Sequence, residues 1–316
     1  MAGSEISLKN KPEYPSKQGR GFKNIFYSQK IAPYLFVLPF IFSFAIFFAY
    51  PVYSTIVMSF QEVLPGQVTF IGFENYKNLW NPTFLKAIWN STVYTALTLL
   101  VLIPFPLLLA VFLNSKLMIA KNLFRSITFI PALTSVVVAG IIFRLIFGSQ
   151  EGALLNSIVG VFGMEPKAWL NHAGTSMFAL VILATWRWMG VNLLYYLAGL
   201  QNIPKELYES AEIDGASTIQ KFFYITVPLL KPIIIYVFTI SIYGGYSMFA
   251  ESYMLYGSNR SPNDIGLTIV GYLYRNGIEQ NNLGLGSAIG ITLLLITFVI
   301  TIIQLKFFGM FKREDS

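Results

Sequence analysis

Six long apolar runs constrain the fold of this chain more than any other feature of its sequence. A helix needs about 20 consecutive apolar residues to cross the hydrocarbon core of a bilayer, and each run is long enough. Only 12% of the residues are charged, against about one quarter in soluble proteins. The sequence therefore predicts an all-α membrane protein with spans near residues 34–58, 88–113, 126–147, 176–200, 232–256 and 285–305.

The distribution of lysine and arginine predicts how these spans are oriented. With the N-terminus inside the cell, most basic residues outside the spans fall on the cytoplasmic side, as the positive-inside rule requires. Both termini are then cytoplasmic, and the N-terminal tail, which has no apolar periodicity, is predicted to be disordered. The chain divides into a basic tail over 1–33, a first span and external loop over 34–86, a core over 87–308 with a polar loop at about 201–231, and a second cytoplasmic tail over 309–316.

The residues that the sequence lacks exclude several classes of enzyme. With no cysteine and a single histidine, His172, the chain has neither a thiol nucleophile nor a Ser-His-Asp arrangement, and no metal site is expected. It has no GxxxxGK[ST] motif to cradle phosphates, so we expect this chain to bind no cofactor. Its basic residues are spread among loops, which argues against nucleic-acid binding. The sequence thus predicts no catalytic residues and no enzymatic activity.

A polar insert between the fourth and fifth predicted spans contrasts with the apolar remainder of the chain. Its spacing predicts a helix over 205–213, a break at Gly215, and a second short helix that Ser217 caps and that runs to Tyr224. We expect Glu209 to fix the two short helices to one another, or to Lys205 or Lys221. A solvated loop is the alternative, although packing gives no reason for so many acids here. The acidic residues are Glu206, Glu209, Glu212 and Asp214.

The insert also resembles the "EAA" loop of permease subunits in binding-protein-dependent ABC importers. The resemblance rests on Glu209-Ser210-Ala211, Gly215, Ile225 and Pro228, with Ser210 in place of the usual alanine and Val227 in place of the usual leucine. It extends from about Phe36 to the C-terminus and is closest to carbohydrate-uptake permeases of the maltose and glycerol-phosphate type. It implies the six-transmembrane-helix bundle of a type I ABC importer permease, with cytoplasmic coupling helices. The other stretches that carry it are 71–76, 124–125, 130–131, 152–156 and 197–204.

This resemblance implies a set of partners. A cytosolic ATPase dimer would bind ATP and Mg²⁺ and dock on the insert, a second related permease would lie beside the chain in the lipid, and an extracytoplasmic solute-binding protein would deliver the solute. The chain would lie in the bacterial plasma (inner) membrane. The residues expected to couple it to the ATPase are Glu206, Glu209, Ala211, Asp214, Gly215, Ala216, Ile225 and Pro228.

The resemblance also implies a sugar substrate. An oligosaccharide or related sugar is expected, with arabinose-containing oligosaccharides and maltodextrins as candidates. A glycerol-phosphate or polyol substrate is an alternative within the same family. Proton-coupled secondary transport, with Glu251 as the titrating residue, is an alternative from another class.

Charged and aromatic residues within the spans indicate a candidate substrate pathway. Arg187 and Glu251 are costly in lipid, so they should face a polar cavity or each other. Three tyrosines recur at helical spacing along the fifth predicted span, where their rings suit sugar faces, although aromatic belts at membrane interfaces are also common. The candidate pathway residues are Arg187, Asn192, Tyr243, Tyr246, Glu251 and Tyr253.

Two external segments, 148–175 and 257–282, are rich in Gly, Asn and Ser. Either could meet the solute-binding protein, and either could be a plain loop.

Overall fold

The computed structural model describes residues 31–115 and 118–310, which form two compact units divided after Ser54. The predicted basic tail therefore lies outside the described residues except for its last three, and the predicted C-terminal tail except for its first two. We describe each unit by itself.

The first unit contains the beginning of an apolar helical run. Pro33 opens it in the first helical turn, where a missing amide hydrogen costs nothing. The run extends into the second unit and covers the first predicted span. Its segments are α2 (Ala32–Phe44), the π-helical turn η1 (Ala45–Ala49) and α3 (Tyr50–Met58).

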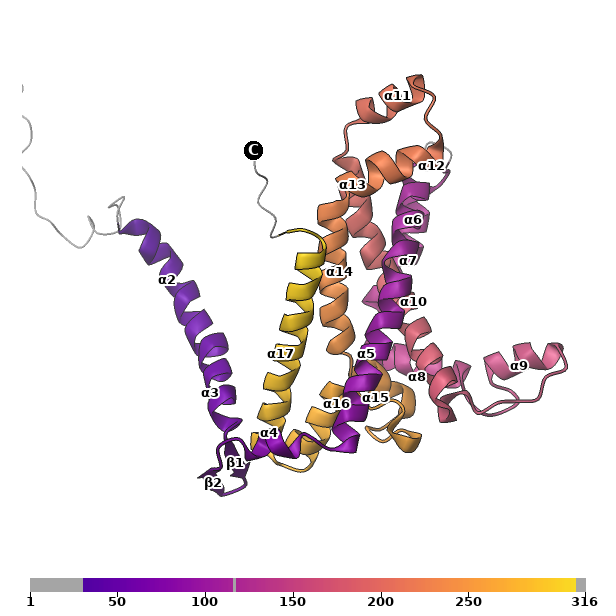
Figure 1. Cartoon of the computed structure of the whole chain (residues 1–316). Coiled ribbons are helices and arrows are strands. Elements are labelled where there is room, and N and C mark those ends of the chain that lie inside the picture. The colour runs from indigo at the N-terminus through magenta and orange to yellow at the C-terminus, as the bar shows by residue number, and fades with distance from the viewer. Residues whose placement is uncertain (1–30, 116–117, 311–316) are drawn as a thin grey trace, which may run out of the picture. The chain divides into compact units, whose positions relative to one another are not determined.

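The second unit is a bundle in which α5, α10, α14 and α17 pack side by side (Figure 1). Asn81 caps α5 by accepting a hydrogen bond from the Phe84 amide, and Pro82 occupies the first turn. The polar segment, with α11 (Lys205–Ile213) and α12 (Thr218–Lys221), lies at one end of the bundle. At the other end lie β1 (Gln61–Leu64), β2 (Gln67–Phe70) and α4 (Glu74–Asn78). The bundle helices are α5 (Pro82–Leu102), α6 (Pro104–Asn114), α10 (Ala173–Gln201), α14 (Lys231–Tyr246) and α17 (Leu283–Phe307).

Two predicted spans are not single straight helices in the structure. The third breaks between α7 (Lys121–Leu133) and α8 (Val136–Ile146), which meet at 96°. The hydroxyl of Ser135 accepts a hydrogen bond from the Val137 amide, so α8 has its own N-cap. The fifth ends at Tyr246, and α15 (Ala250–Tyr256) is a separate helix.

Counted by length and composition within the described residues, four helices can cross a membrane, or up to six if each bent pair forms one span. The second bent pair joins residues 218–229 to α14 at 68°. The mostly helical, multi-span architecture confirms the predicted fold class.

The end of the bundle opposite α11 contains short elements that the sequence did not predict individually. The two strands pair antiparallel, with Gln61 opposite Phe70. Asn75 on α4 is buried and donates to the carbonyls of Ser59 and Gln61, which ties α4 to the hairpin. These elements are β1 (Gln61–Leu64), β2 (Gln67–Phe70), α4 (Glu74–Asn78), α9 (Leu154–Val161), η2 (Trp169–Asn171), η4 (Pro262–Asp264), α16 (Ile269–Leu273) and η5 (Tyr274–Glu279).

One close helix crossing stands out in the core. A Cβ built on Gly190 of α10 would collide with the carbonyl oxygen of Thr128 on α7. Glycine at this position lets the two backbones approach more closely than any side chain would allow.

Candidate coupling segment and transport pathway

The polar insert forms two short helices joined by a sharp turn, as predicted. The first, α11 (Lys205–Ile213), has the predicted bounds. Gly215 follows with φ of +77°, a left-handed conformation that glycine adopts without a steric penalty. Its amide donates to Glu212 O at 3.1 Å and the Ala216 amide to Ala211 O at 2.8 Å, which is the Schellman pattern of helix termination.

The second helix begins with a capping box. The Ser217 hydroxyl accepts from the Gln220 amide, and the Gln220 side chain accepts from the Ser217 amide. The helix does not stop at Tyr224, because it continues through a π-helical segment into the turn that contains Pro228. Its segments are α12 (Thr218–Lys221), η3 (Phe222–Thr226) and α13 (Val227–Leu229). We call residues 205–229 the coupling segment.

An ion pair joins the two helices, but it is not the one predicted. Lys221 Nζ lies 2.6 Å from Glu212 Oε1, with the lysine side chain mostly buried and the glutamate exposed. Within the described part of the chain, no ion pair includes Glu209. The prediction failed because Glu212, in the last turn of α11, lies nearer the connecting turn than Glu209 does.

The predicted coupling residues fall into two groups in the structure. Three of them, Ala211, Ala216 and Ile225, are half-buried, and the other five are exposed. Sequence reasoning missed the large apolar residues that the segment also exposes. The exposed predicted residues are Glu206, Glu209, Asp214, Gly215 and Pro228. The exposed large apolar residues are Leu207, Ile213, Ile219, Phe223, Tyr224 and Leu229.

Arg187 on α10 and Glu251 on α15 are brought together inside the bundle. Arg187 Nη1 lies 2.8 Å from Glu251 Oε1, and only 11% and 14% of the two side chains are exposed. The Arg187 guanidinium also lies over the Trp188 ring, at 5.4 Å from its centroid. Its Nε has no hydrogen-bond partner among the described residues. Each charge therefore offsets the other at a depth where an isolated charge is costly.

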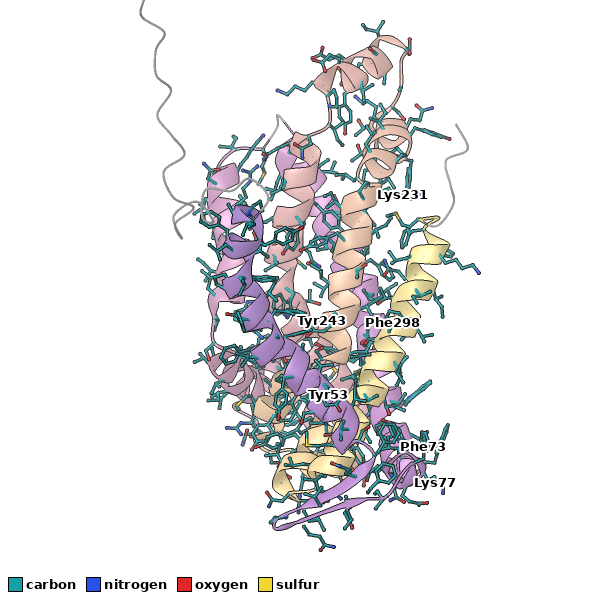
Figure 2. The ribbon with its side chains drawn as sticks, turned by 90° about the vertical axis from the view of Figure 1, so that its left-hand side faces the viewer. Tyr53, Phe73, Lys77, Lys231, Tyr243 and Phe298 are labelled. Carbon is teal, nitrogen blue, oxygen red and sulfur yellow. The ribbon has the colours of Figure 1, made fainter. Side chains whose placement is uncertain are left out.

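The three predicted pathway tyrosines do not form one stripe, because α14 ends at Tyr246. Tyr243 is 69% exposed on α14 (Figure 2). Tyr246 is buried and shares a hydrogen bond of 3.0 Å with Thr92. Tyr253 lies on α15, where its ring packs against Phe249 and Tyr274. The three tyrosines have helical spacing in the sequence, but the helix breaks between the second and the third, and the spacing does not show this.

Asn192 is buried, and its side chain completes the backbone of a neighbouring helix. Its Nδ2 donates to the carbonyl oxygen of Leu102 at 2.9 Å. The residue four positions after Leu102 is Pro106, which has no amide hydrogen to offer that carbonyl. Asn192 thus supplies the missing donor where α5 gives way to α6.

The two segments that the sequence predicts to be external are held in place by hydrogen bonds from their own side chains. The Asn156 side chain is buried, donates to the carbonyls of Gly148, Gln150 and Lys167, and accepts from the Lys167 amide and Trp169 Nε1. All the hydrogen-bonding groups of one amide are thereby used to close this loop.

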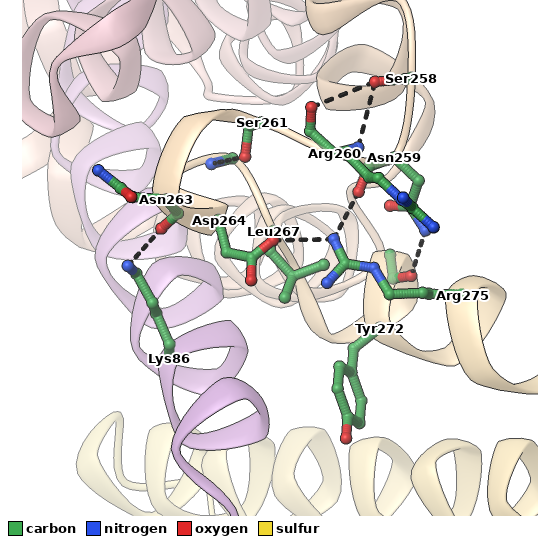
Figure 3. Close-up of polar contacts among 12 residues, drawn as sticks. Lys86, Ser258, Asn259, Arg260, Ser261, Asn263, Asp264, Leu267, Tyr272 and Arg275 are labelled. Carbon is green, nitrogen blue, oxygen red and sulfur yellow. Dashed lines mark hydrogen bonds and ion pairs between the residues drawn. The ribbon is translucent and has the colours of Figure 1, made fainter.

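In the second segment, Arg275 Nη2 donates to Asn259 O at 2.6 Å and to Asp264 Oδ1 at 2.9 Å (Figure 3). Lys86 on α5 donates to Asn263 O, and Asn90 donates to Asp264 O and Leu267 O. Residues 259–267 of this segment are therefore held against α5 on one side and against η5 on the other.

The second unit is a helical bundle with candidate membrane spans, a polar helical segment at one end and a buried ion pair inside, as a membrane transport permease would require. Residues 102–308 match the family described as binding-protein-dependent transport system inner membrane component. The chain belongs to this family: it is the permease of an ABC importer and a multi-pass inner-membrane protein, and is not itself an enzyme. This confirms the resemblance that the EAA-like loop suggested and sets aside the proton-coupled alternative.

The chain is similar to two arabinooligosaccharides transport system permease proteins named AraP. It is 58% identical to that of Bacillus subtilis (strain 168), covering 93% of this chain and 94% of the relative, and 53% identical to that of Halalkalibacterium halodurans, covering 92% of each. Its fold is similar to that of a crystallised bacterial ABC transporter involved in the import of the acidic polysaccharide alginate. That similarity has a TM-score of 0.80 and 24% sequence identity, covering 92% of this chain and 99% of the other.

Proposed function

We propose that this chain is one permease half of an importer for arabinose-containing oligosaccharides. The observation that carries the proposal is 58% identity, over 93% of the chain, to a permease named for that substrate class. The interior charges agree with a neutral solute, because Glu251 offsets Arg187 and leaves no unbalanced cation in that pair for a phosphate. A glycerol-phosphate or polyol substrate and maltodextrins are outcomes of the test below.

The energy for transport comes, in this proposal, from a cytosolic ATPase dimer that docks on the coupling segment. The ATPase binds ATP and Mg²⁺, and this chain binds no cofactor. Exposed Ile213 and Tyr224 give the segment an apolar contact surface, and exposed Glu206 and Glu209 give it charge. Both termini and the coupling segment then lie in the cytoplasm, on the side where the sequence concentrates lysine and arginine.

We propose that Arg187, Glu251 and Tyr243 lie along one face that the substrate passes, with a second related permease forming the opposite wall. Tyr243 lies twelve residues after Lys231, so it is about 18 Å further along α14 at 1.5 Å per residue. A largely exposed tyrosine at that depth lies beyond the interfacial aromatic belt of the inner leaflet. Its ring could stack on a sugar. Tyr246, Tyr253 and Asn192 would support this face through the contacts described above.

An extracytoplasmic solute-binding protein would dock at the opposite end of the bundle from the coupling segment. Segments 148–175 and 257–282 are the candidate surface, since each is closed by partly buried side-chain hydrogen bonds. A rigid surface binds a partner with a smaller loss of conformational entropy than a loose loop does.

Reconstituted transport tests this proposal. The chain would be assembled in vesicles with its second permease, ATPase and solute-binding protein, and uptake of labelled arabinotriose, maltotriose and glycerol 3-phosphate would be compared with and without internal ATP. We expect ATP-dependent uptake of arabinotriose in preference to the other two. Preferred uptake of maltotriose or glycerol 3-phosphate would overturn the substrate assignment, and uptake that needs no ATP would overturn the mechanism.

A further inference from the structure

A side-chain hydrogen bond ties the two arms of the coupling segment together at their base. Tyr208 Oη on α11 and Thr226 Oγ1 at the end of η3 lie 2.9 Å apart. Thr226 is only 3% exposed, and Tyr208 is half-buried. The caps, the Schellman turn and the ion pair described above do not involve either hydroxyl, so the bond is an additional link between α11 and η3.

The link is attached to the bundle on the side of α11. Tyr208 packs against the apolar cluster that includes Leu200 and Ile203 at the end of α10 and Leu230 before α14. The first arm is thereby anchored at its middle, while its N-terminal end follows directly from α10.

At its other end, the link joins Thr226, which lies next to the bend between η3 and α14. Thr226 is the last residue of the π-helical segment η3, two residues before Pro228, and the chain bends by 68° between residues 218–229 and α14. The Thr226 hydroxyl also lies 3.4 Å from Lys221 O, within the same helix. A π turn followed by proline has fewer regular backbone hydrogen bonds than an α-helix, so side-chain bonds matter more for holding its angle.

Together with the Lys221–Glu212 ion pair, the hydroxyl bond closes a loop of contacts. Glu212 and Tyr208 lie four residues apart on α11, and therefore on one face of that helix. Two contacts at different positions along α11 fix the angle between α11 and the second helix, whereas a single contact would let the two helices rotate about it. Water reaches the ion pair on its Glu212 side, which is 62% exposed, and weakens it, so the hydroxyl bond, with Thr226 buried, is the firmer of the two.

We infer that Tyr208 and Thr226 are positioning residues that hold α11 at a fixed angle to η3 and α14, so that force applied to the coupling segment moves α14 as one body. This inference rests on the proposed docking of the ATPase. Without the bond, α11 would yield when the ATPase closes, and ATP would be hydrolysed with less transport.

The test uses the whole reconstituted importer and measures moles of sugar transported per mole of ATP hydrolysed. Tyr208→Phe and Thr226→Val each remove one hydroxyl with little change of shape. We expect each to lower the ratio about three- to tenfold, the factor that one hydrogen bond represents, and the double variant to lower it no further. Thr226→Ser keeps the hydroxyl and should retain the normal ratio.

Tyr76→Phe provides a matched control. Tyr76 Oη donates to Ser59 Oγ at 2.8 Å in a similar tyrosine–hydroxyl pair at the opposite end of the bundle. Loss of that bond should leave the ratio unchanged, because no force is transmitted there. An equal fall in Tyr76→Phe would mean that any lost hydroxyl bond impairs transport, and would overturn the inference.

Co-purification of the ATPase distinguishes failure of the positioning role from failure of the proposed ATPase docking. An unchanged ratio in Tyr208→Phe and Thr226→Val, with the ATPase bound, would overturn the inference and leave the proposed function standing. Loss of the ATPase from these variants alone would also overturn it, because a transmission defect requires a bound ATPase. Failure of the ATPase to bind the unsubstituted chain would refute the proposed function, and the inference with it.

Discussion

The coupling segment and the centre of the bundle each contain a glycine at a critical position, and the two glycines do different things. Gly215 has a φ of +77°, and a Cβ built on it would meet no atom within 4 Å. Gly190 has an ordinary helical backbone, but its Cβ would collide with Thr128 O. Local backbone conformation therefore selects the first glycine, and close packing of distant segments selects the second.

The ion pairs of the two regions also differ, in this case in how exposed they are. Glu212 of the coupling segment is 62% exposed in its ion pair with Lys221, whereas Arg187 and Glu251 are largely buried in theirs. An exposed pair contributes about 0–1 kcal/mol, but breaking a buried pair leaves an uncompensated charge. Substitutions in the coupling segment should thus destabilise the protein less than substitutions at the bundle centre.

The largest effect is expected for Arg187→Met, which leaves Glu251 buried without its partner. We expect the free energy of unfolding to fall by about 3–5 kcal/mol, measured by chemical unfolding in detergent micelles. The double variant Arg187→Met/Glu251→Met should recover most of this loss. If the single and double variants are equally unstable, the ion pair is not what offsets the buried charge.

A smaller effect is expected for Gly190→Ala, which forces α7 and α10 apart. Overpacking of this kind costs about 1–3 kcal/mol, measurable in the same unfolding experiment. Gly174→Ala is the matched control, because Gly174 also lies on α10 and a Cβ there meets nothing within 4 Å. Equal stability of the two variants would contradict the close crossing.

Asn192→Leu tests the repair of the α5–α6 junction. It removes the donor to Leu102 O and leaves that carbonyl without a partner in the bundle interior. Side-chain hydrogen bonds within membranes contribute about 1–2 kcal/mol at most, so the expected loss of stability lies in that range. Asn202→Leu removes an exposed bond to Ala198 O and should change stability less. The reverse order would show that Leu102 finds another donor.

The most local effect is expected for Gly215→Ala, which changes one turn outside the bundle. A left-handed backbone costs a residue with a Cβ about 1–2 kcal/mol, and asparagine less than alanine. Hydrogen exchange of the amides over 205–226 should therefore accelerate in Gly215→Ala more than in Gly215→Asn, while the rest of the bundle is unchanged. Faster exchange throughout the bundle would mean that the coupling segment is not a separate local unit.

The sequence predicted the coupling segment well because local rules determine it. The bounds of α11, the left-handed Gly215 and the cap at Ser217 all follow from helix-terminus chemistry within a few residues. The apolar runs likewise predicted a multi-span helical bundle without tertiary information. In each of these cases the residues that decide the structure are neighbours in the sequence.

The remainder depended on contacts between residues far apart in the sequence. The pairing of Arg187 with Glu251 spans 64 positions, and the sequence left open whether the two residues meet. The break between α7 and α8 had a visible signal in Ser135, a capping residue inside an apolar run, but composition alone does not show that the chain turns by 96° there. The separation of Tyr253 from Tyr243 was missed because residue spacing does not show that α14 ends at Tyr246. Glu212 was missed because the prediction did not consider which acid of α11 lies nearest the connecting turn.

The central claim is that a cytosolic ATPase docks on the coupling segment and drives transport through it. Thiol labelling tests this claim most directly. The chain has no cysteine, so Ile213→Cys and Val161→Cys each introduce a single thiol, at positions 87% and 84% exposed. In intact cells, a membrane-impermeant maleimide should label Val161→Cys but not Ile213→Cys. In opened membranes, Ile213→Cys should react, and bound ATPase should protect it. Labelling of Ile213→Cys from outside intact cells, as fast as Val161→Cys, would contradict the account.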